Sequence, residues 1–332
     1  MDAYRAGTAL FLVAVAVSGA VNASAQTVAE RVEQHVAAAR QAAGEQHLAL
    51  FNRICPSLAE PPEIIDDSPV GLPATPGREL WYTEPVQVFD NLYYVGQTEY
   101  SAWALETSEG IIVIDAIFDY SVEAEIAEGL RTLGLDPNDI EYVIISHGHG
   151  DHVGGAAFLQ QEFGARVVMA EADWDLVEAS TADWPKPRRD IVATDGQQIR
   201  LGDTSVTVYL TPGHTPGTIS TVLPLRDGDR THVAAYWGGT AFNFQGSEEF
   251  PRDYWLRAYR DSAERFRAIA RAAYADVLLS NHPSFDGTPA KVAALAEHEP
   301  DDPHPYVIGN DIVSSYLTVA QECAEATLLS ED

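Results

Sequence analysis

A ten-residue segment, residues 146–155, constrains this chain more than any other part of its sequence. It reads Ser-His-Gly-His-Gly-Asp-His-Val-Gly-Gly, so four metal-binding side chains fall within six residues: His147, His149, Asp151 and His152. Imidazole and carboxylate donors at this density favour zinc or a similar borderline ion. The apolar run 141–146 just before them predicts a buried strand. The donors therefore follow the end of a strand, which is where α/β folds bind ligands.

The spacing of these donors predicts two groups. In an extended or turning segment, residues i and i+2 project to the same side, so His147, His149 and Asp151 can face one cavity. The intervening glycines let the backbone bend tightly between them. His152 breaks the alternation, so one metal could take His147 and His149 while Asp151 and His152 reach a second. The alternative is a solvated loop with chance histidines, but such a loop would not also follow a buried strand and precede a Gly-Gly helix start.

Two later histidines are further candidate ligands. His214 lies within Leu-Thr-Pro-Gly-His-Thr-Pro-Gly, residues 210–217, and the two Pro-Gly pairs predict a rigid turn around it. His282 comes two residues after the end of a short buried-strand pattern at residues 276–280. A lone histidine at a strand end is more often a hydrogen-bonded structural residue than a ligand. Here both occur in the context that the first cluster requires, so we interpret both as ligands.

On these residues the chain resembles the metallo-β-lactamase superfamily, and within it the subclass B3 enzymes. The resemblance covers about residues 86–286 and is carried by the HxHxDH motif at 147–152 and by Gly-His-Thr-Pro-Gly at 213–217. It implies an α/β fold, the αββα sandwich, in which two packed β-sheets carry helices on their outer faces. It also implies two zinc ions per chain, the first held by His147, His149 and His214 and the second by Asp151, His152 and His282. Asp115, which ends the predicted strand 110–115, matches a strand-end aspartate of the family and is expected to orient a ligand or its loop.

One absent ligand points to subclass B3. Many relatives place a further metal ligand after the strand that follows the His214 loop, a cysteine in subclass B1 and a bridging aspartate in thioesterases, lactonases and tRNA-processing members. Here that strand is predicted at about 230–236, and residues 231–250 contain neither Cys nor Asp. Three ligands per metal without a bridging carboxylate is the B3 arrangement. Flavo-diiron oxidases resemble this fold too, but carry Glu at the position of His149.

These ligands predict a hydrolase. Paired zinc ions lower the pKa of a shared water, and the resulting metal-bound hydroxide attacks a carbonyl carbon. Asp151 would steer the water or accept its proton, and the zinc at His214 would polarise the carbonyl oxygen. We expect a B3-like metallo-β-lactamase that opens the β-lactam amide. B3 enzymes commonly carry hydroxyl groups near residues 238 and 240, and only Thr240 provides one here. A hydrolase acting mainly on another lactone, ester or amide is therefore the alternative, and a metal-binding scaffold without turnover is a third reading.

Two loops are expected to shape the pocket, because the equivalent loops overhang the metals in B3-like relatives. Residues 179–190 include Trp184 and Lys186, and residues 237–252 begin with Trp237. An anionic substrate would benefit from Lys186 in an otherwise acidic protein. The alternative for each of these residues is an ordinary solvated loop position.

The N-terminus and the charge define the compartment and the partners. An apolar run at 8–21 and Ala-Ser-Ala at 23–25 predict a signal peptide over residues 1–25, and hence a periplasmic or secreted protein. A membrane anchor is the rival interpretation, but the run is shorter than the roughly 20 residues needed to span a bilayer, so we expect no stable membrane insertion after cleavage. With 50 acidic and 20 basic residues the formal net charge is -30, which repels nucleic acid. A small-molecule substrate is the expected partner.

The remaining sequence fits one catalytic domain. The 332 residues are 46% hydrophobic, enough for one large core. We expect an N-terminal helix and a wrapping extension over 26–85 and the metallo-β-lactamase-like domain over 86–332, with helices at 122–133, 254–275 and 311–328. The two cysteines, Cys55 and Cys323, would form a disulfide in an exported protein. Two separate buried thiols are the alternative.

Overall fold

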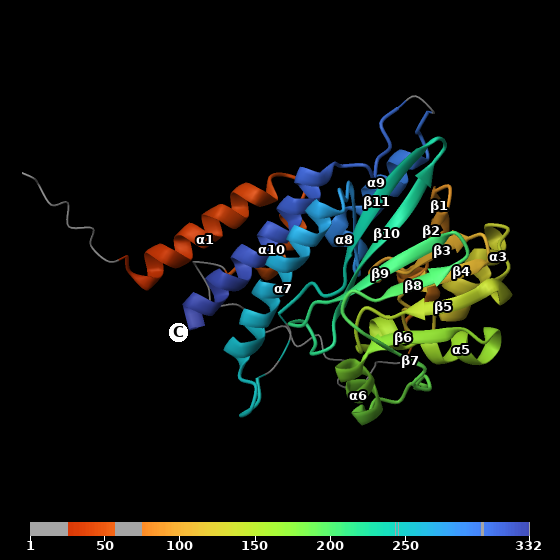
Figure 1. Cartoon of the computed structure of the whole chain (residues 1–332), viewed down its shortest axis with the longest axis horizontal. Helices are drawn as coiled ribbons and strands as arrows, with labels where there is room; N and C mark the ends of the chain where they lie inside the picture. Colours follow the sequence, from red (N-terminus) through yellow and green to blue (C-terminus); the bar gives the residue numbers. More distant parts are fainter. Residues whose placement is uncertain (1–25, 57–74, 243, 245, 300–301, 332) are drawn as a thin grey trace, which may run out of the picture.

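The computed structural model describes residues 26–56, 75–242, 244, 246–299 and 302–331. Two β-sheets pack face to face, and helices cover the outer face of each (Figure 1). This four-layer arrangement confirms the αββα sandwich predicted from the sequence. The predicted signal peptide and residues 57–74 of the predicted wrapping extension lie outside the described residues.

The seven-stranded sheet has its strands in sequence order, antiparallel from β1 to β4 and parallel from β4 to β7. Its strands are β1 (Val86–Phe89), β2 (Leu92–Tyr94), β3 (Trp103–Thr107), β4 (Gly110–Ile114), β5 (Ile140–Ile144), β6 (Arg166–Ala170) and β7 (Ile191–Ala193). The five-stranded sheet has the order β12-β11-β10-β9-β8, with only β11 and β12 parallel. Its strands are β8 (Gln198–Leu201), β9 (Thr204–Leu210), β10 (Ile219–Asp227), β11 (Arg230–Trp237) and β12 (Val277–Ser280).

Strand β4 shows why the apolar run 111–114 folds as a central strand. Ile112 and Ile114 pack into the core between the two sheets, whereas Ile111 and Val113 pack against the helices on the other face. Because parallel strands of such a sheet are buried on both faces, their sequences are apolar throughout rather than alternating. At the carboxyl end of β5, Ile144 likewise packs between the sheets and Val143 against the helices, and this end leads into the segment 146–155.

The helices fall into two layers. The outer face of the seven-stranded sheet is covered by a π-helical turn (Glu123–Ala127), α3 (Glu128–Thr132) and α5 (Ala156–Phe163), with α6 (Glu171–Ala179) at the edge near β6 and β7. The five-stranded sheet is covered by α7 (Arg252–Ala272) and α10 (Asn310–Glu331). Short helices α4 (Gly150–Val153), α8 (Pro283–Asp286) and α9 (Thr288–Leu295) follow strand ends and loops. No helix within these described ranges combines the length and apolar character needed to cross a bilayer.

The helices expected from the sequence are present, with shifted boundaries. The helix predicted over 122–133 starts as the π-helical turn and ends before Gly134, which has a φ of +83° as expected for a stop residue. Helices α7 and α10 correspond to the predicted helices 254–275 and 311–328. Helix α6 and strand β7 were not predicted from the sequence. Helix α6 has no side-chain N-cap, so the usual start signal is missing.

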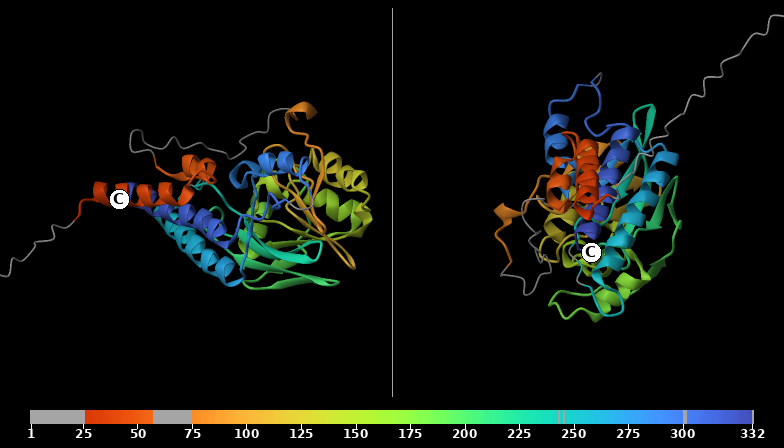
Figure 2. Two further views of the ribbon diagram at one scale, coloured as in Figure 1. Left: turned by 90° about the horizontal axis from the view of Figure 1, so that it is seen from above. Right: turned by 90° about the vertical axis from the view of Figure 1, so that its left-hand side faces the viewer.

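The N-terminal extension packs on the C-terminal helix. It forms two helices, α1 (Val28–Ala43) and α2 (Leu48–Ile54), separated at Gly44, whose φ is +52°. Helix α1 starts with a capping box between Thr27 and Glu30 and lies along α10 (Figure 2). The predicted disulfide is present, because Cys55 at the end of α2 is bonded to Cys323 of α10. Chain segments 268 residues apart are thereby tied together.

Replacing Cys55 and Cys323 together by serine should lower the free energy of unfolding by about 2–5 kcal/mol, since the unfolded chain loses a long covalent loop. Urea unfolding followed by circular dichroism measures this, and wild-type protein under reducing conditions should shift to the same midpoint. An unchanged midpoint in both samples would show that the bond adds no stability.

Candidate metal centre

The six predicted donors come from loops at the carboxyl ends of three strands. The segment after β5 carries His147 and His149, and the backbone is extended at His149 directly before α4, which carries Asp151 and His152. The change from extended to helical backbone explains why His152 breaks the alternation. His214 follows β9 in the five-stranded sheet, and His282 follows β12. The two sheets thus contribute to one site at their common edge.

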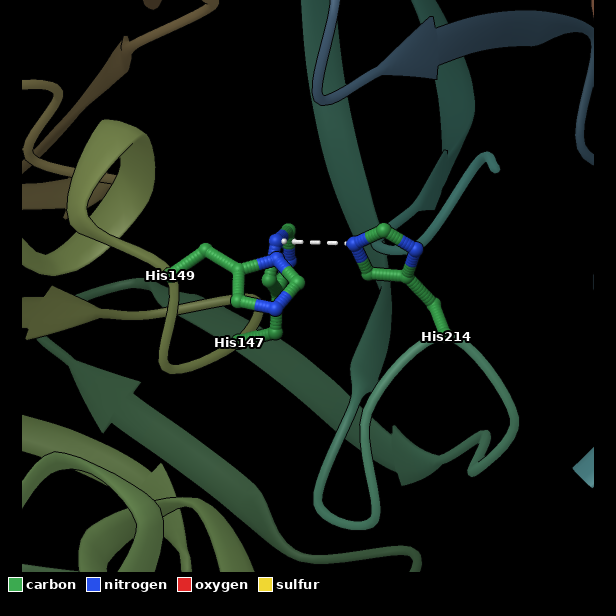
Figure 3. A group of neighbouring side chains, drawn as sticks. All are labelled: His147, His149 and His214. Atoms are coloured by element: carbon green, nitrogen blue, oxygen red, sulfur yellow. Dashed lines mark hydrogen bonds between the residues drawn. The ribbon is translucent and has the colours of Figure 1, made fainter. Parts of the chain in front are cut away.

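His147, His149 and His214 form the first group (Figure 3). Their potential ligand atoms all lie within 4.8 Å of one another. The Nε2 atoms of His147 and His214 are 3.1 Å apart, the contact drawn as a dashed line in Figure 3. Two nitrogens bound to one tetrahedral zinc at the usual bond length are about 3.3–3.4 Å apart. The observed spacing is therefore close to that of a shared metal ion.

The other ring nitrogens show which atoms are free to bind. Nδ1 of His147 lies 2.9 Å from the carbonyl oxygen of Gly238, and Nδ1 of His214 lies 2.8 Å from that of Ala241. A carbonyl only accepts hydrogen bonds, so both Nδ1 atoms carry the proton. Burial, with the neighbouring histidines, holds the pKa of both rings well below the usual 6.5. Two neutral rings therefore direct Nε2 lone pairs at each other, an arrangement that a cation between them would stabilise.

Asp151, His152 and His282 lie together in a second group. Oδ2 of Asp151 is 3.2 Å from Nε2 of His152 and 3.9 Å from Nε2 of His282. Nδ1 of His282 contacts the carbonyl oxygen of Glu99 at 3.0 Å, which leaves Nε2 facing Asp151. The rings of His147 and His152 are only 4.2 Å apart between centroids, so the two groups adjoin. Asp151 and His152 also form a compact cluster with His147, so the assignment of each donor to one ion stays a prediction.

The charges of the second group favour a cation. Burial lowers the pKa of His152, but Asp151 and Asp115 on either side outweigh it and raise that pKa to about 10. His282 behaves oppositely, because burial and His152 lower its pKa to about 4. Although burial raises the pKa of Asp151, the surrounding histidines lower it below its usual range. The group holds a carboxylate and a proton at neutral pH, and a metal ion would replace that proton on Nε2 of His152.

Asp115 orients the second group through its contact with Nδ1 of His152. This fully buried carboxylate accepts hydrogen bonds from the backbone N–H and the hydroxyl of Ser146 at 2.6 and 2.8 Å, and contacts Nδ1 of His152 at 2.9 Å. Tyr236 of β11 donates its hydroxyl to the same carboxylate at 2.5 Å. Asp115 also has a φ of +60°, an uncommon value for a residue other than glycine. Its contacts support the predicted role of orienting a ligand and its loop.

The remaining predicted residues lie at different distances from the donors. Thr240 is buried and donates its hydroxyl to the side-chain oxygen of Asn281 at 2.6 Å, and the amide nitrogen of Asn281 lies 3.5 Å from Nε2 of His152. Thr240 therefore reaches the donors through Asn281. Trp237 does not line the site as predicted, because its indole is buried against Tyr259 and Phe266 beneath α7.

Trp184 and Lys186 form one unit beside the metal loop. The indole of Trp184 is buried so close to Gly150 that a Cβ there would lie 3.4 Å from its nitrogen. The ammonium of Lys186 lies 3.8 Å from the centre of the Trp184 ring and donates to the carbonyl oxygens of Ala182 and Trp184. Lys186 is thus folded onto Trp184 rather than extended.

The two glycines that follow β11, Gly238 and Gly239, lie too close to neighbouring atoms to be replaced by a residue with a side chain. A Cβ at Gly238 would lie 1.8 Å from the carbonyl oxygen of Ile219, and one at Gly239 would lie 2.5 Å from Cβ of His214. Only glycine fits at these two positions, so neither of the first two residues after β11 can carry a metal-binding side chain.

Two buried residues at the centre were not singled out from the sequence. Tyr236 is one, and its position in the apolar alternation of β11 concealed its hydroxyl. The other is Asp173 of α6, which accepts hydrogen bonds from the backbone N–H groups of Gly148 and Gly217. A lone aspartate in the first turn of an unpredicted helix carries no sequence signal of such contacts.

Comparison with known proteins agrees with this geometry. Residues 95–228 match the family model of the metallo-beta-lactamase superfamily. Over 191 residues the chain is 30% identical to a hydroxyacylglutathione hydrolase of Neisseria meningitidis, an alignment that covers 53% of this chain and 67% of the relative. The chain belongs to the metallo-β-lactamase superfamily. Its fold and histidine-rich donor set support a metallo-hydrolase.

Other relatives match over shorter stretches. A hydroxyacylglutathione hydrolase of Acidiphilium cryptum is 32% identical over 120 residues, and the chain spans only 43% of its length. Among solved structures, a subclass B3 metallo-β-lactamase of Bradyrhizobium japonicum is 29% identical with a TM-score of 0.62, covering 72% of this chain and 91% of that one. A mutant metallo-β-lactamase from Legionella gormanii superimposes with a TM-score of 0.65 over 73% of this chain and 94% of that one, but at 22% identity it supports the fold alone.

Asp115→Asn should weaken metal binding by about 10–100-fold, because an amide cannot accept all four hydrogen bonds and would turn a donor toward one of them. Tyr236→Phe removes only one of these bonds and should have the smaller effect. Zinc affinity measured by chelator competition tests both. Equal affinities for wild type and Asp115→Asn would exclude the orienting role.

Proposed function

We propose that this member of the superfamily is an exported dinuclear zinc hydrolase of B3 type that opens the β-lactam amide. The observation that carries the proposal is the convergence of six candidate donors around an edge where Gly238 and Gly239 leave no room for a side chain. The likeness to the B3 enzyme of Bradyrhizobium japonicum supports the same type. The predicted signal peptide and the Cys55–Cys323 disulfide support export.

The donors have distinct tasks in this proposal. His147, His149 and His214 hold one zinc ion, and Asp151, His152 and His282 hold the other. When bound, such a pair supplies Lewis acidity and lowers the pKa of water into the physiological range. Asp151 is only half-buried, and its carboxylate can orient that water and accept its proton. Asp115 keeps the His152 ring in the tautomer whose Nε2 faces the metal.

A second candidate is a related hydrolase that acts mainly on a lactone, ester or thioester. Two observations favour it, since Thr240 directs its hydroxyl at Asn281 and Lys186 lies folded onto Trp184. Neither group is poised to hold the carboxylate that β-lactams carry. Several relatives are named hydroxyacylglutathione hydrolase, which adds a thioester to the candidate substrates.

A substrate panel separates the two candidates. Purified protein without the signal peptide is assayed with zinc against nitrocefin and meropenem, in parallel with a lactone, an aryl ester and a glutathione thioester. The first proposal predicts nitrocefin hydrolysis that chelation abolishes and zinc restores. Metal-dependent turnover of the lactone, ester or thioester alone would transfer the function to the second candidate. No turnover of any substrate by zinc-loaded protein would contradict both.

His149→Ala and His282→Ala should each abolish hydrolysis and reduce bound zinc to about one ion or fewer per chain, because each change removes one of only three donors for its metal. His298→Ala serves as the matched control, since that histidine lies after α9 and contacts the carbonyl oxygen of Asp302. It should retain full activity. Elemental analysis together with the hydrolysis rate measures both effects, and full activity with two zinc ions in either donor variant would refute the assignment.

A further inference from the structure

Asp173 is a buried carboxylate that no role in the hydrolase so far accounts for. It lies in the first turn of α6, three residues after the end of β6, and is fully buried. An acidic residue at this position usually serves the free N–H groups of its own helix. Here both carboxylate oxygens are engaged outside the helix, by two loops that come from different sheets.

All three hydrogen bonds to Asp173 are short. The backbone N–H of Gly148 and the hydroxyl of Thr215 donate to Oδ2, each at 2.7 Å. The backbone N–H of Gly217 donates to Oδ1, also at 2.7 Å. Burial raises the pKa of Asp173 to about 6, against the opposing effect of these three donors. All three partners donate to the carboxylate, which favours its ionised form, and charge-assisted bonds of this kind are stronger than neutral ones.

The three partners are the neighbours of the first metal group. Gly148 stands between His147 and His149 in the loop after β5, while Thr215 and Gly217 follow His214 in the loop after β9. One carboxylate thus joins the two loops that carry all three donors of that group. His147 and His214 are 67 residues apart in the sequence, and they follow strands of different sheets, β5 and β9.

The glycines in both loops match this close approach. A Cβ at Gly217 would lie 2.7 Å from the backbone nitrogen and Oδ1 of Asp173. A Cβ at Gly148 would lie 3.2 Å from the carbonyl oxygen of Asp173. Helix α6 therefore packs against the His214 loop at a distance that only glycine allows, and tightly against the His147 loop.

We propose that Asp173 is a positioning residue for the metal group His147, His149 and His214. By holding the two loops at a fixed separation, it sets the spacing of the Nε2 atoms before an ion binds. The inference rests on the zinc site of the proposed function, but not on the identity of the substrate. The conformational entropy of the two loops is then lost when the protein folds. Metal binding does not have to order the loops, so the ion binds more tightly.

Asp173→Asn tests the proposal, with Asp190→Asn as the matched control. An asparagine keeps the size of the side chain, but its NH2 group must face the N–H of either Gly148 or Gly217. Asp190 also accepts hydrogen bonds from a backbone N–H, that of Val167 at 3.2 Å, and from Gln160 at 2.6 Å. It also pairs with Arg188 at the end of the loop 179–190. Its hydrogen bonds among the described residues reach α5, β6 and its own loop, and none of these carries a metal donor, so Asp190→Asn reports the general cost of replacing a hydrogen-bonded aspartate.

Zinc affinity is measured by chelator competition in the His282→Ala background, which leaves only the first group complete. We expect Asp173→Asn to weaken binding by about 10–100-fold, as for other groups that orient metal ligands. Asp190→Asn should stay within about threefold of its parent. Thr215→Val removes one of the three hydrogen bonds to Asp173 and should give an intermediate loss of zinc affinity. This variant replaces Asp173→Asn in the test if Asp173→Asn does not fold.

The outcomes separate this inference from the proposed function. Unchanged zinc affinity in folded Asp173→Asn or Thr215→Val would overturn it, as would an equal loss in Asp190→Asn. Zinc affinity that falls as expected, in a protein that hydrolyses none of the substrates, would support the positioning role while contradicting the function. If wild type hydrolyses a substrate but Asp173→Asn and Thr215→Val bind zinc as tightly as their parent, the proposed function would be supported and the positioning role contradicted.

Discussion

The metal centre depends on one close contact, in which His147 and His214 meet at the common edge of the two sheets. Their Nε2 atoms are 3.1 Å apart, and each ring carries its proton on the far side, against a backbone carbonyl. Two lone pairs held face to face are unfavourable unless a cation lies between them. The fold must therefore stabilise this arrangement from outside, and the surrounding contacts show how it does so.

Two buried aspartates, Asp115 and Asp173, provide that support. Asp115 links the ends of β4 and β5 to Tyr236 of β11 and orients His152. Asp173 links the loops that contain His147 and His214. Each carboxylate accepts hydrogen bonds from both sheets or their loops, so its burial is compensated and the sheets are fixed relative to each other. Rigid support of this kind is what a metal-binding site requires.

The parts predicted from sequence are those with a dense local pattern. The HxHxDH segment after β5 and the Gly-His-Thr-Pro-Gly segment after β9 carried the family resemblance, which predicted the fold and placed the candidate donors at strand ends. The Cys55–Cys323 bond was also predicted correctly, because only two cysteines occur. Asp173 could not be found in this way, since its partners Gly148 and Gly217 are distant in sequence and α6 lacks a capping residue.

Asp173 was not predicted from the sequence, whereas Trp237 was wrongly predicted to lie at the pocket. Its place at the start of the loop 237–252 suggested a pocket residue, but alternation along β11 turns its indole toward α7 and the hydroxyl of Tyr236 toward Asp115. A strand reverses side at every residue, so proximity in sequence to a site does not determine which side chain faces it. The closed positions at Gly238 and Gly239 likewise depend on Ile219 and His214, and became evident only in three dimensions.

Anomalous X-ray diffraction at the zinc edge, from crystals of the purified protein grown with zinc, tests the central claim most directly. We predict two anomalous peaks per chain, one bounded by His147, His149 and His214 and the other by Asp151, His152 and His282. No peak between His147 and His214, in a crystal where zinc is bound elsewhere, would contradict the claim that the two sheets converge to hold a metal ion.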